Sequence, residues 1–395
     1  MSALNNIRIL DFGRFVAGPY CAAMLADFGA DVIRIDRLGG SEDRALTPVT
    51  EDQSGDGAIF LQANRNKRSM TLNMQSDRRG DVLRRLIASA DVIIANVPPQ
   101  SLQKMGLDYE TVSQIRADII LANISSFGTK GPWAERPGFD SVGQAMCGSA
   151  YLTGEGSSPY RTPISWVDHA TALYVAFGIM VALLERAATG KGQQIDGSLL
   201  GSALACSSTY LVEEAMVQAD RQPIGNRSHI NGPTDAFRTN DGWIVTQVVG
   251  QPIFERWARL VGEPEWLVDP RFASDRLRGT NGRVLSERMS LWCANLSSAE
   301  ALEALARAGV PAGPVLSPKQ ALEHPQVKAM ELFQSIWVPG LNRSAPLIQA
   351  PIHMSESSRR IRRPPPQVGE HTNEVLSELG FDPREIAEFR ASGLI

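Results

Sequence analysis

The chain has 395 residues, of which 43% are hydrophobic and 21% are charged, and its formal net charge is −4. These values are typical of an ordinary globular protein, and the length predicts two or three domains. The slightly acidic balance argues against a nucleic-acid partner, because proteins that bind polyanions carry a basic patch or stripe. Four dispersed cysteines without a CxxC spacing and five dispersed histidines favour neither a disulfide framework nor a metal site.

The first residues, MSALNNIRILDFG, lack the basic region and the long apolar region of a signal peptide. An uncharged run at residues 170–184 is shorter than the ~20 residues that a membrane-spanning helix needs. We therefore expect a cytoplasmic protein that does not associate with membranes. The run belongs to a long expected helix at residues 167–186, which is apolar nearly all round and so predicted to be buried.

Short apolar segments alternate with helical patterns through the first 128 residues. The expected strands are IRILDFG (7–13), DVIRID (31–36), SMTLNM (69–74), DVIIANV (91–97) and DIILANISSFG (118–128). Helices are expected at residues 18–29, 77–90 and 108–117. This alternation predicts βαβ units and a mostly parallel sheet, that is, an α/β fold. Ligands bind beyond the carboxyl ends of such strands, at residues 14–18, 36–37, 96–99 and 125–131.

The character of the chain changes after about residue 220. The segment DAFRTNDGWIVTQVV predicts a β-hairpin that turns at Asn240, Asp241 and Gly242. A capping box at Ser297 and Glu300 predicts the start of a helix. These features indicate a smaller α+β domain. Two short helices, TNEVLSELG and DPREIAEFRASG, are expected to close the chain.

Asp168 begins the long expected helix, where Asp is a preferred N-cap residue. A catalytic role is the alternative interpretation. Asp36 ends the second expected strand, where the ribose-binding acid of a dinucleotide-dependent dehydrogenase would lie. The first turn reads DFGRFVAGP, however, without the GxGxxG that binds the pyrophosphate. P-loop, GxSxG and HExxH motifs are also missing from the sequence.

Several sequence blocks, taken in order, resemble one enzyme family. They are VAGPYCAAMLADFGADVIRID, NRNKRSMTLNM, ADVIIANVPPQSLQKMGLDYE, RPGFDSVGQAMCG, GNRSHINGPTDAFRTNDGWI, AGVPAGPVLSPKQALEHPQV and GEHTNEVLSELGF. The whole series is similar to the family III CoA-transferases, the CaiB/BaiF family, which includes formyl-CoA transferase-like enzymes and α-methylacyl-CoA racemases. The resemblance covers almost the full length of the chain.

The resemblance implies a large Rossmann-like CoA-binding domain at residues 1–205, to which residues 330–395 return. A small α+β domain would span residues 225–325, with linkers at 206–224 and 326–345. In this family each subunit is an open ring, and two rings interlock as a homodimer. The implied reaction moves CoA from an acyl-CoA to a carboxylic acid such as succinate, mesaconate or citramalate. Acyl-CoA is then a substrate, and no metal or permanently bound cofactor is expected.

The resemblance also assigns roles to individual residues. Asp168 matches the catalytic aspartate, which would form an aspartyl anhydride and then an aspartyl-CoA thioester. Positions at the family's CoA site correspond to Ala17, Arg37, Leu72, Asn96, Lys104 and Met105. Phe139 and Asp140 match residues that line the reaction chamber, and Gly250 and Gln251 match a loop that covers the intermediate.

Two alternative functions share these features. One is an α-methylacyl-CoA racemase, and the other is a CoA-binding protein without turnover. A racemase needs an acid and a base on opposite sides of the α-carbon. The family's racemases have a histidine where this chain has Phe139. His169 follows Asp168 directly, and neighbours on a helix point about 100° apart. The sequence therefore favours the transferase.

Overall fold

The computed structural model describes residues 3–51 and 55–395, which form two compact units. Unit 1 comprises Met1–Cys147, Pro163–Ser208 and Met330–Ile395, and unit 2 comprises Gly148–Thr162 and Thr209–Ala329. Both ends of the chain thus belong to unit 1. Residues 148–162, which the sequence analysis grouped with the large domain, belong to unit 2.

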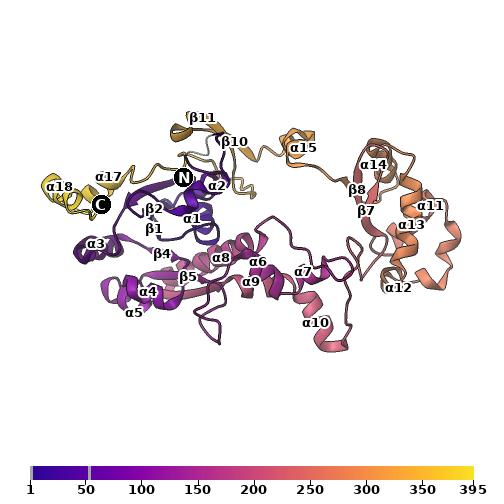
Figure 1. Cartoon of the computed structure of the whole chain (residues 1–395), viewed down its shortest axis with the longest axis horizontal. Helices are drawn as coiled ribbons and strands as arrows, with labels where there is room; N and C mark the ends of the chain where they lie inside the picture. Colours follow the sequence, from indigo (N-terminus) through magenta and orange to yellow (C-terminus); the bar gives the residue numbers. More distant parts are fainter. Residues whose placement is uncertain (1–2, 52–54) are drawn as a thin grey trace. The chain divides into compact units, whose positions relative to one another are not determined.

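A six-stranded sheet, parallel throughout, forms the centre of unit 1 (Figure 1). Its strands are β1 (Arg8–Asp11), β2 (Asp31–Asp36), β3 (Lys67–Thr71), β4 (Val92–Ala95), β5 (Ile120–Ser125) and β6 (Gln193–Ser198). They lie in the order β3-β2-β1-β4-β5-β6, so the direction of winding reverses between β1 and β4. This confirms the predicted α/β fold with a parallel sheet, and it places the ligand crevice at that reversal.

Strand β6 was not expected from the sequence. It reads QQIDGS, and it pairs only with β5 at the edge of the sheet. An edge strand is partly open to solvent, so it lacks the continuous apolar run that identifies the buried strands β4 and β5. The helices of unit 1 are α1 (Ala17–Asp27), α2 (Ala58–Ala63), α3 (Gly80–Ser89), α4 (Pro99–Met105), α5 (Tyr109–Ile115), α6 (Asp140–Met146), α8 (Trp166–Thr189), α9 (Leu199–Cys206), α17 (Thr372–Glu378) and α18 (Pro383–Ala391).

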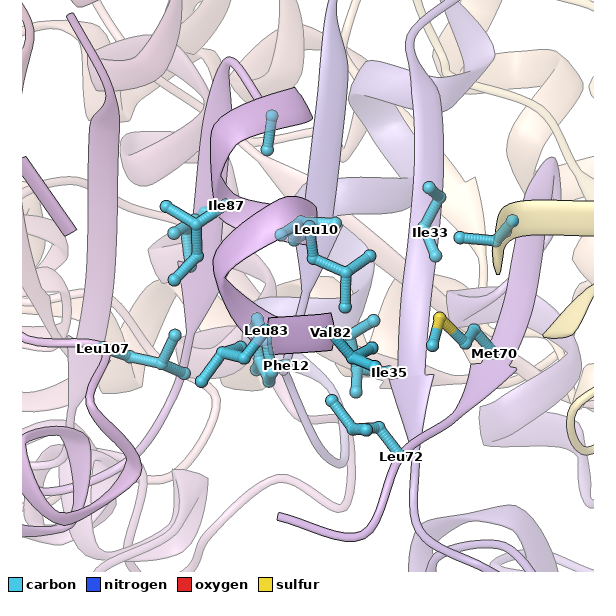
Figure 2. Close-up of a cluster of buried hydrophobic side chains, with 14 of the residues drawn as sticks. Leu10, Phe12, Ile33, Ile35, Met70, Leu72, Val82, Leu83, Ile87 and Leu107 are labelled. Carbon is cyan, nitrogen blue, oxygen red and sulfur yellow. The ribbon is translucent and has the colours of Figure 1, made fainter. Parts of the chain in front are cut away.

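Successive side chains of a strand point to opposite faces of the sheet, and those on the two faces belong to two separate hydrophobic cores. On one face α3 packs Val82 beside Ile35 and Ile87 beside Leu10, as Figure 2 shows. On the other face α1 and α8 cover the side chains that point the opposite way. The buried side chains of α3 are Val82, Leu83, Leu86 and Ile87, which form one apolar stripe.

Helix α8 is only half covered within the chain. Its inner face packs on the sheet through residues that include Val175 and Ile179, and Gly197 of β6 allows a close approach, since a Cβ there would lie 2.5 Å from Val175. An outer stripe is exposed and apolar, and it comprises Leu173, Tyr174, Phe177, Val181 and Leu184. The prediction that the whole helix is buried was wrong, because the sheet covers only one of its faces.

By length and composition α8 could also cross a membrane, and it is the one described helix of which this is true. Its inner face, however, belongs to the hydrophobic core of unit 1. A membrane segment is therefore not needed to explain why the helix is apolar.

The C-terminal stretch is tied to the sheet. The N–H of Thr71 in β3 donates to Oγ1 of Thr372 over 3.1 Å, and the N–H of Asn73 donates to the carbonyl of Leu394 over 2.8 Å. In Figure 1 the yellow helices α17 and α18 accordingly lie beside the indigo strands. A hairpin of β10 (Phe333–Val338) and β11 (Arg343–Ile348) precedes them. The sequence analysis expected a linker there.

Unit 2 contains an antiparallel sheet in the order β7-β8-β9. Its strands are β7 (Thr234–Arg238), β8 (Trp243–Gln247) and β9 (Ala312–Pro314). The β7–β8 hairpin turns at Asn240–Gly242, and Ser297 and Glu300 form the capping box, both as predicted. The helices of unit 2 are α7 (Ser149–Leu152), α10 (Ser208–Val217, which begins one residue before the unit), α11 (Gln251–Leu260), α12 (Asp275–Thr280), α13 (Gly282–Cys293), α14 (Ser298–Arg307), α15 (Pro318–Glu323) and α16 (Pro325–Ala329).

Candidate active site

A cavity of about 190 Å³ lies at the reversal point of the sheet in unit 1. Part of its wall follows the carboxyl ends of β1, β4 and β5, where the sequence predicts a ligand. The rest comes from the segment before α6, from the first turn of α8 and from the start of α9. The lining residues are Phe15, Val16, Ala17, Asn96, Val97, Pro98, Ile124, Ser125, Ser126, Ala134, Arg136, Pro137, Gly138, Phe139, Asp168 and Leu199.

The turn between β1 and α1 carries an aromatic residue in the left-handed backbone region. Phe15 has a φ of 63°, which is strained for a bulky side chain. Its N–H donates to Oδ2 of Asp43 over 3.1 Å, and Asn96 exchanges two 2.7 Å hydrogen bonds with the backbone of Arg14. The Phe15 ring packs edge-on against Phe139 at a centroid distance of 5.3 Å. These contacts hold the turn that forms one wall of the cavity.

Behind this turn lies a cluster of ionic side chains that is sealed from water. Lys67 Nζ lies 2.7 Å from Asp11 Oδ2, and Arg34 bonds Asp36 at 2.9 Å and Asp43 at 3.0 Å. Burial raises the pKa of Asp36. The guanidinium groups of Arg34 and Arg44 lower it more strongly and hold the pKa below its usual value. Because Asp36 is buried and engaged in this cluster, it is not placed to bind a ribose, and the dehydrogenase interpretation is not supported.

Asp168 is the third residue of α8 and does not cap that helix. The N-cap position is Ser165, whose side chain makes no capping hydrogen bond. Asp140, from the start of α6, takes this role, because its Oδ2 accepts the N–H of Val167 at 2.8 Å and that of Asp168 at 3.1 Å. The carboxylate of Asp168 is therefore left to line the cavity. The N-cap interpretation of Asp168 was wrong in this respect.

The pKa of Asp168 is raised to about 7. Burial is the larger cause, because it disfavours the charged form, and the nearby negative charge of Asp140 adds to it. A carboxyl group with such a pKa, in a cavity, is typical of a functional site. Near neutral pH it exchanges readily between a protonated form and a carboxylate.

Comparison with known proteins agrees with this geometry. The chain matches the model of CoA-transferase family III over residues 4–372. The chain belongs to this family. It is 33% identical over 404 residues to the succinyl-CoA–L-malate CoA-transferase beta subunit of Chloroflexus aurantiacus, covering 99% of this chain and 98% of that one. It is 32% identical to the succinyl-CoA:glutarate CoA-transferase of Mus musculus, covering 100% of this chain and 91% of the relative.

A solved structure leads to the same family. The crystal structure of a CaiB/BaiF family protein from Brucella suis superimposes with a TM-score of 0.82 at 30% identity, covering 96% of this chain and 99% of that one. The chain is thus a CoA-transferase, an enzyme that moves CoA from an acyl-CoA thioester to a carboxylic acid.

Four of the residues that the sequence analysis singled out meet in the cavity of this CoA-transferase. Ala17 opens α1, Asn96 follows β4, and Phe139 and Asp168 lie at the starts of α6 and α8. Asp140 is buried behind them, with both oxygens engaged.

Four others lie in unit 1 outside the cavity lining. Arg37 is exposed and pairs with Glu42 at 3.2 Å. Leu72 is buried in the core beneath α3, and Met105 packs against the same core. Lys104 is exposed on α4.

The remaining two predicted residues belong to unit 2. Gly250 has a φ of 80° and donates its N–H to Asp275 over 2.8 Å. Gln251 begins α11, donates to Glu255 over 3.1 Å and accepts a hydrogen bond from Arg278. These bonds shape the entry into α11.

His169 faces a different cavity from Asp168. That cavity, of about 340 Å³, is lined by His169 together with Tyr20 and Ser165. The imidazole packs edge-on against Tyr20 at 4.7 Å, and its Nδ1 lies 2.7 Å from the carbonyl of Ser165. The sequence analysis expected His169 to point away from Asp168, and the two side chains do line separate cavities.

Arg136 is the functional candidate that the sequence analysis missed. It lies in the block RPGFD, from which only Phe139 and Asp140 were predicted to be site residues, and it lines the cavity with Asp168. The short sequence distance between Arg136 and Phe139 could have indicated that Arg136 belongs to the site. Among the described residues, no cluster of three or more His, Cys, Asp or Glu side chains could hold a metal ion.

Replacing Asp168 by Asn should stabilise the protein at neutral pH and have little effect near pH 4. The carboxyl group ionises near 3.8 in the unfolded chain and near 7 in the folded one. Between these values the folded state holds an extra proton, so wild-type stability falls as the pH rises. Above pH 7 the advantage of Asp168→Asn should level off at about 1–3 kcal/mol. Urea unfolding from pH 4 to pH 8 measures it.

The matched control is Asp81→Asn, which removes an exposed carboxylate from α3. In an Asp140→Asn background the pH-dependent part of the Asp168→Asn effect should shrink, because one cause of the raised pKa is gone. A stability difference that stays constant from pH 4 to pH 8 would contradict the raised pKa of Asp168.

Proposed function

We propose that this enzyme transfers CoA from succinyl-CoA to a small dicarboxylic acid, with Asp168 as the nucleophile. The observation that carries the proposal is the position of the Asp168 carboxylate, which lines the cavity at the sheet reversal while Asp140 caps its helix. The relatives described above are named for succinyl-CoA as donor and for malate or glutarate. They support the choice of substrates.

The proposed reaction proceeds through two covalent intermediates. The carboxylate of Asp168 attacks the thioester carbonyl, the C–S bond breaks, and a mixed anhydride and CoA thiolate form. The thiolate attacks the aspartyl carbonyl, which releases the donor acid and leaves an aspartyl-CoA thioester. The acceptor carboxylate then repeats the two steps in reverse. One thioester replaces another, so the reaction needs no separate energy source.

The raised pKa of Asp168 suits this reaction. The ionised form is the nucleophile, and it predominates above about pH 7. A carboxylate in a partly buried cavity has lost part of its hydration, which makes it more reactive than one in water. The backbone N–H groups of Val167 and Asp168 do not assist the substrate directly, because both donate to Asp140.

We infer that CoA extends from the cavity across the carboxyl edge of the sheet. Ala17 and Asn96 would contact its reactive end, because both line the cavity. Arg37 and Lys104 would meet the phosphates, since both are exposed and charged. The exposed ion pair of Arg37 is weak enough to be exchanged for a phosphate.

The other predicted contacts are of a different kind. Leu72 and Met105 would support the CoA site through packing, because both side chains belong to the core beneath α3. Phe139 would line the acyl chamber, and Asp140 would act by holding Asp168. The covering role of Gly250 and Gln251 stays a prediction.

The racemase alternative lacks its second titratable group. Phe139 cannot carry a proton, and His169 lines a separate cavity. A CoA-binding protein without turnover is disfavoured by the carboxylate of Asp168, which lines the cavity. A cytoplasmic location stays a prediction.

We further propose the interlocked homodimer of open-ring subunits. The exposed apolar stripe on α8 supports it, since Phe177 is 71% exposed and Leu184 is 70% exposed in the single chain. Stripes of this kind mark contact with another apolar surface.

Sedimentation velocity at nanomolar concentration should therefore show a dimer. Phe177→Glu should prevent dimer formation, because it places a charge within the stripe. Val268→Glu is the control, since it also places a Glu at an exposed apolar residue, in unit 2. A wild-type protein that is monomeric and active would rule out the interlocked dimer.

Asp168→Ala should remain folded and bind CoA while losing at least 10³-fold in turnover, because the covalent route is closed. Steady-state transfer from succinyl-CoA to glutarate measures the loss, and calorimetry with CoA measures binding. Ser125→Ala, a polar lining residue with no proposed chemical role, is the control. Turnover within tenfold of wild type in a folded Asp168→Ala protein would disprove the assignment.

A further inference from the structure

Most polar groups in the wall of the Asp168 cavity are already satisfied by the chain. The side-chain amide of Asn96 exchanges hydrogen bonds with the backbone of Arg14 in both directions. The hydroxyl of Ser126 donates to the carbonyl of Gly138 over 2.8 Å, and Ser125 Oγ accepts a backbone N–H of its own turn at 2.9 Å. These groups shape the wall and are not available to bind a ligand strongly.

The lining also contains two ionic side chains of opposite sign. One is the carboxylate of Asp168, and the other is the guanidinium of Arg136. No other Lys, Arg, Asp or Glu belongs to the residues that line this cavity. Within the described part of the chain Arg136 has neither an ion pair nor a side-chain hydrogen bond. Its five N–H donors are therefore open to a ligand.

The guanidinium of Arg136 is held by an aromatic stack. Its Cζ lies 4.3 Å from the centroid of the Trp133 ring, and Trp133 packs edge-on against Phe127 at 5.2 Å. Gly138 allows this arrangement, because a Cβ there would lie 3.1 Å from the Phe127 ring. A cation over an aromatic face is stabilised without using its N–H donors. Arg136 is thus an exposed residue of the cavity lining whose guanidinium is positioned by Trp133 and has no ion pair among the described residues.

A planar guanidinium binds a carboxylate through two parallel hydrogen bonds. In the proposed reaction one carboxyl group of a dicarboxylic acid becomes joined to Asp168, and its second carboxylate remains charged in the same small cavity. That charge needs a partner, since an unpaired ion in a partly buried site is costly. The phosphates of CoA are separated from the thioester by the whole pantetheine arm, so a cation in the lining that contains Asp168 is better placed for the acyl end of the substrate than for a phosphate.

We propose that Arg136 binds the distal carboxylate of the dicarboxylic acid and so determines the preference for dicarboxylic over monocarboxylic acceptors. This inference rests on the proposed function, because it assumes that Asp168 reacts in the same cavity.

The test compares two acceptors of equal chain length, glutarate and pentanoate, with succinyl-CoA as the common donor. The ratio of their kcat/KM values depends only on acceptor steps, because both acceptors react with the same enzyme–CoA intermediate. Arg136→Gln should lower this ratio at least tenfold, mainly through a higher KM for glutarate. Arg136→Lys should give an intermediate ratio, because it keeps the positive charge and loses the paired N–H donors that bind both oxygens of a carboxylate.

Two further variants sharpen the comparison. Trp133→Leu removes the stacking partner and keeps the cation, so the ratio should fall less than in Arg136→Gln. Arg84→Gln removes an exposed arginine from α3, outside the cavity, and should leave the ratio unchanged.

Three outcomes would overturn the inference. One is a wild-type enzyme that uses pentanoate as well as glutarate. Another is an unchanged ratio in an Arg136→Gln protein that still forms its enzyme–CoA intermediate. The third is a raised KM for every acyl-CoA with no change in the acceptor ratio, which would assign Arg136 to CoA. Failure of the proposed function is distinguishable, because a wild-type protein would then transfer CoA to neither acid and form no intermediate.

Discussion

The active site depends on one interaction, in which the buried carboxylate of Asp140 caps the first turn of α8. A helix start leaves several backbone N–H groups without partners. Because a residue from another helix satisfies two of them, Asp168 is spared that task although it lies within the same turn. The same contact brings two carboxylates close together and contributes to the raised pKa of Asp168. Position and acidity of the proposed nucleophile thus have a common origin.

The sheet and the buried ionic cluster place the rest of the cavity. Reversal of the winding between β1 and β4 opens the space, and the β1–α1 turn enters it with Phe15 in a strained conformation. Asp43 holds that turn through the N–H of Phe15 and is itself held by Arg34. Phe15 in turn contacts Phe139, the residue directly before Asp140. The cluster and the capping carboxylate are therefore linked through a pair of aromatic rings.

Much of the fold and part of the site could be predicted from sequence. A buried parallel strand is often a continuous apolar run, so β4 was recognised, whereas β6 lies at an edge and has no such run. The parallel sheet also predicts that the residues after the carboxyl ends of its strands lie at the edge where a ligand binds. That Asp140 would cap α8 did not follow, because the two residues are 28 positions apart and only the packing of α6 on α8 brings them together. Local reasoning assigned the cap to Asp168 instead.

Arg136 was missed for a related reason. An isolated arginine in a polar loop is ordinarily solvated, and its role depends on Trp133 and on the other residues of the cavity wall. The exposed stripe on α8 shows the converse problem. Apolar content predicts burial, but it does not tell whether the covering surface belongs to the same chain.

The central claim is that Asp168 forms a covalent bond with CoA during transfer. The most direct measurement is mass spectrometry of the enzyme mixed with succinyl-CoA in the absence of acceptor, followed by peptide mapping. The account predicts a CoA adduct on the peptide that contains Asp168, which glutarate discharges as glutaryl-CoA and hydroxylamine converts to a hydroxamate. Full turnover without any adduct, or an adduct on another residue, would contradict it.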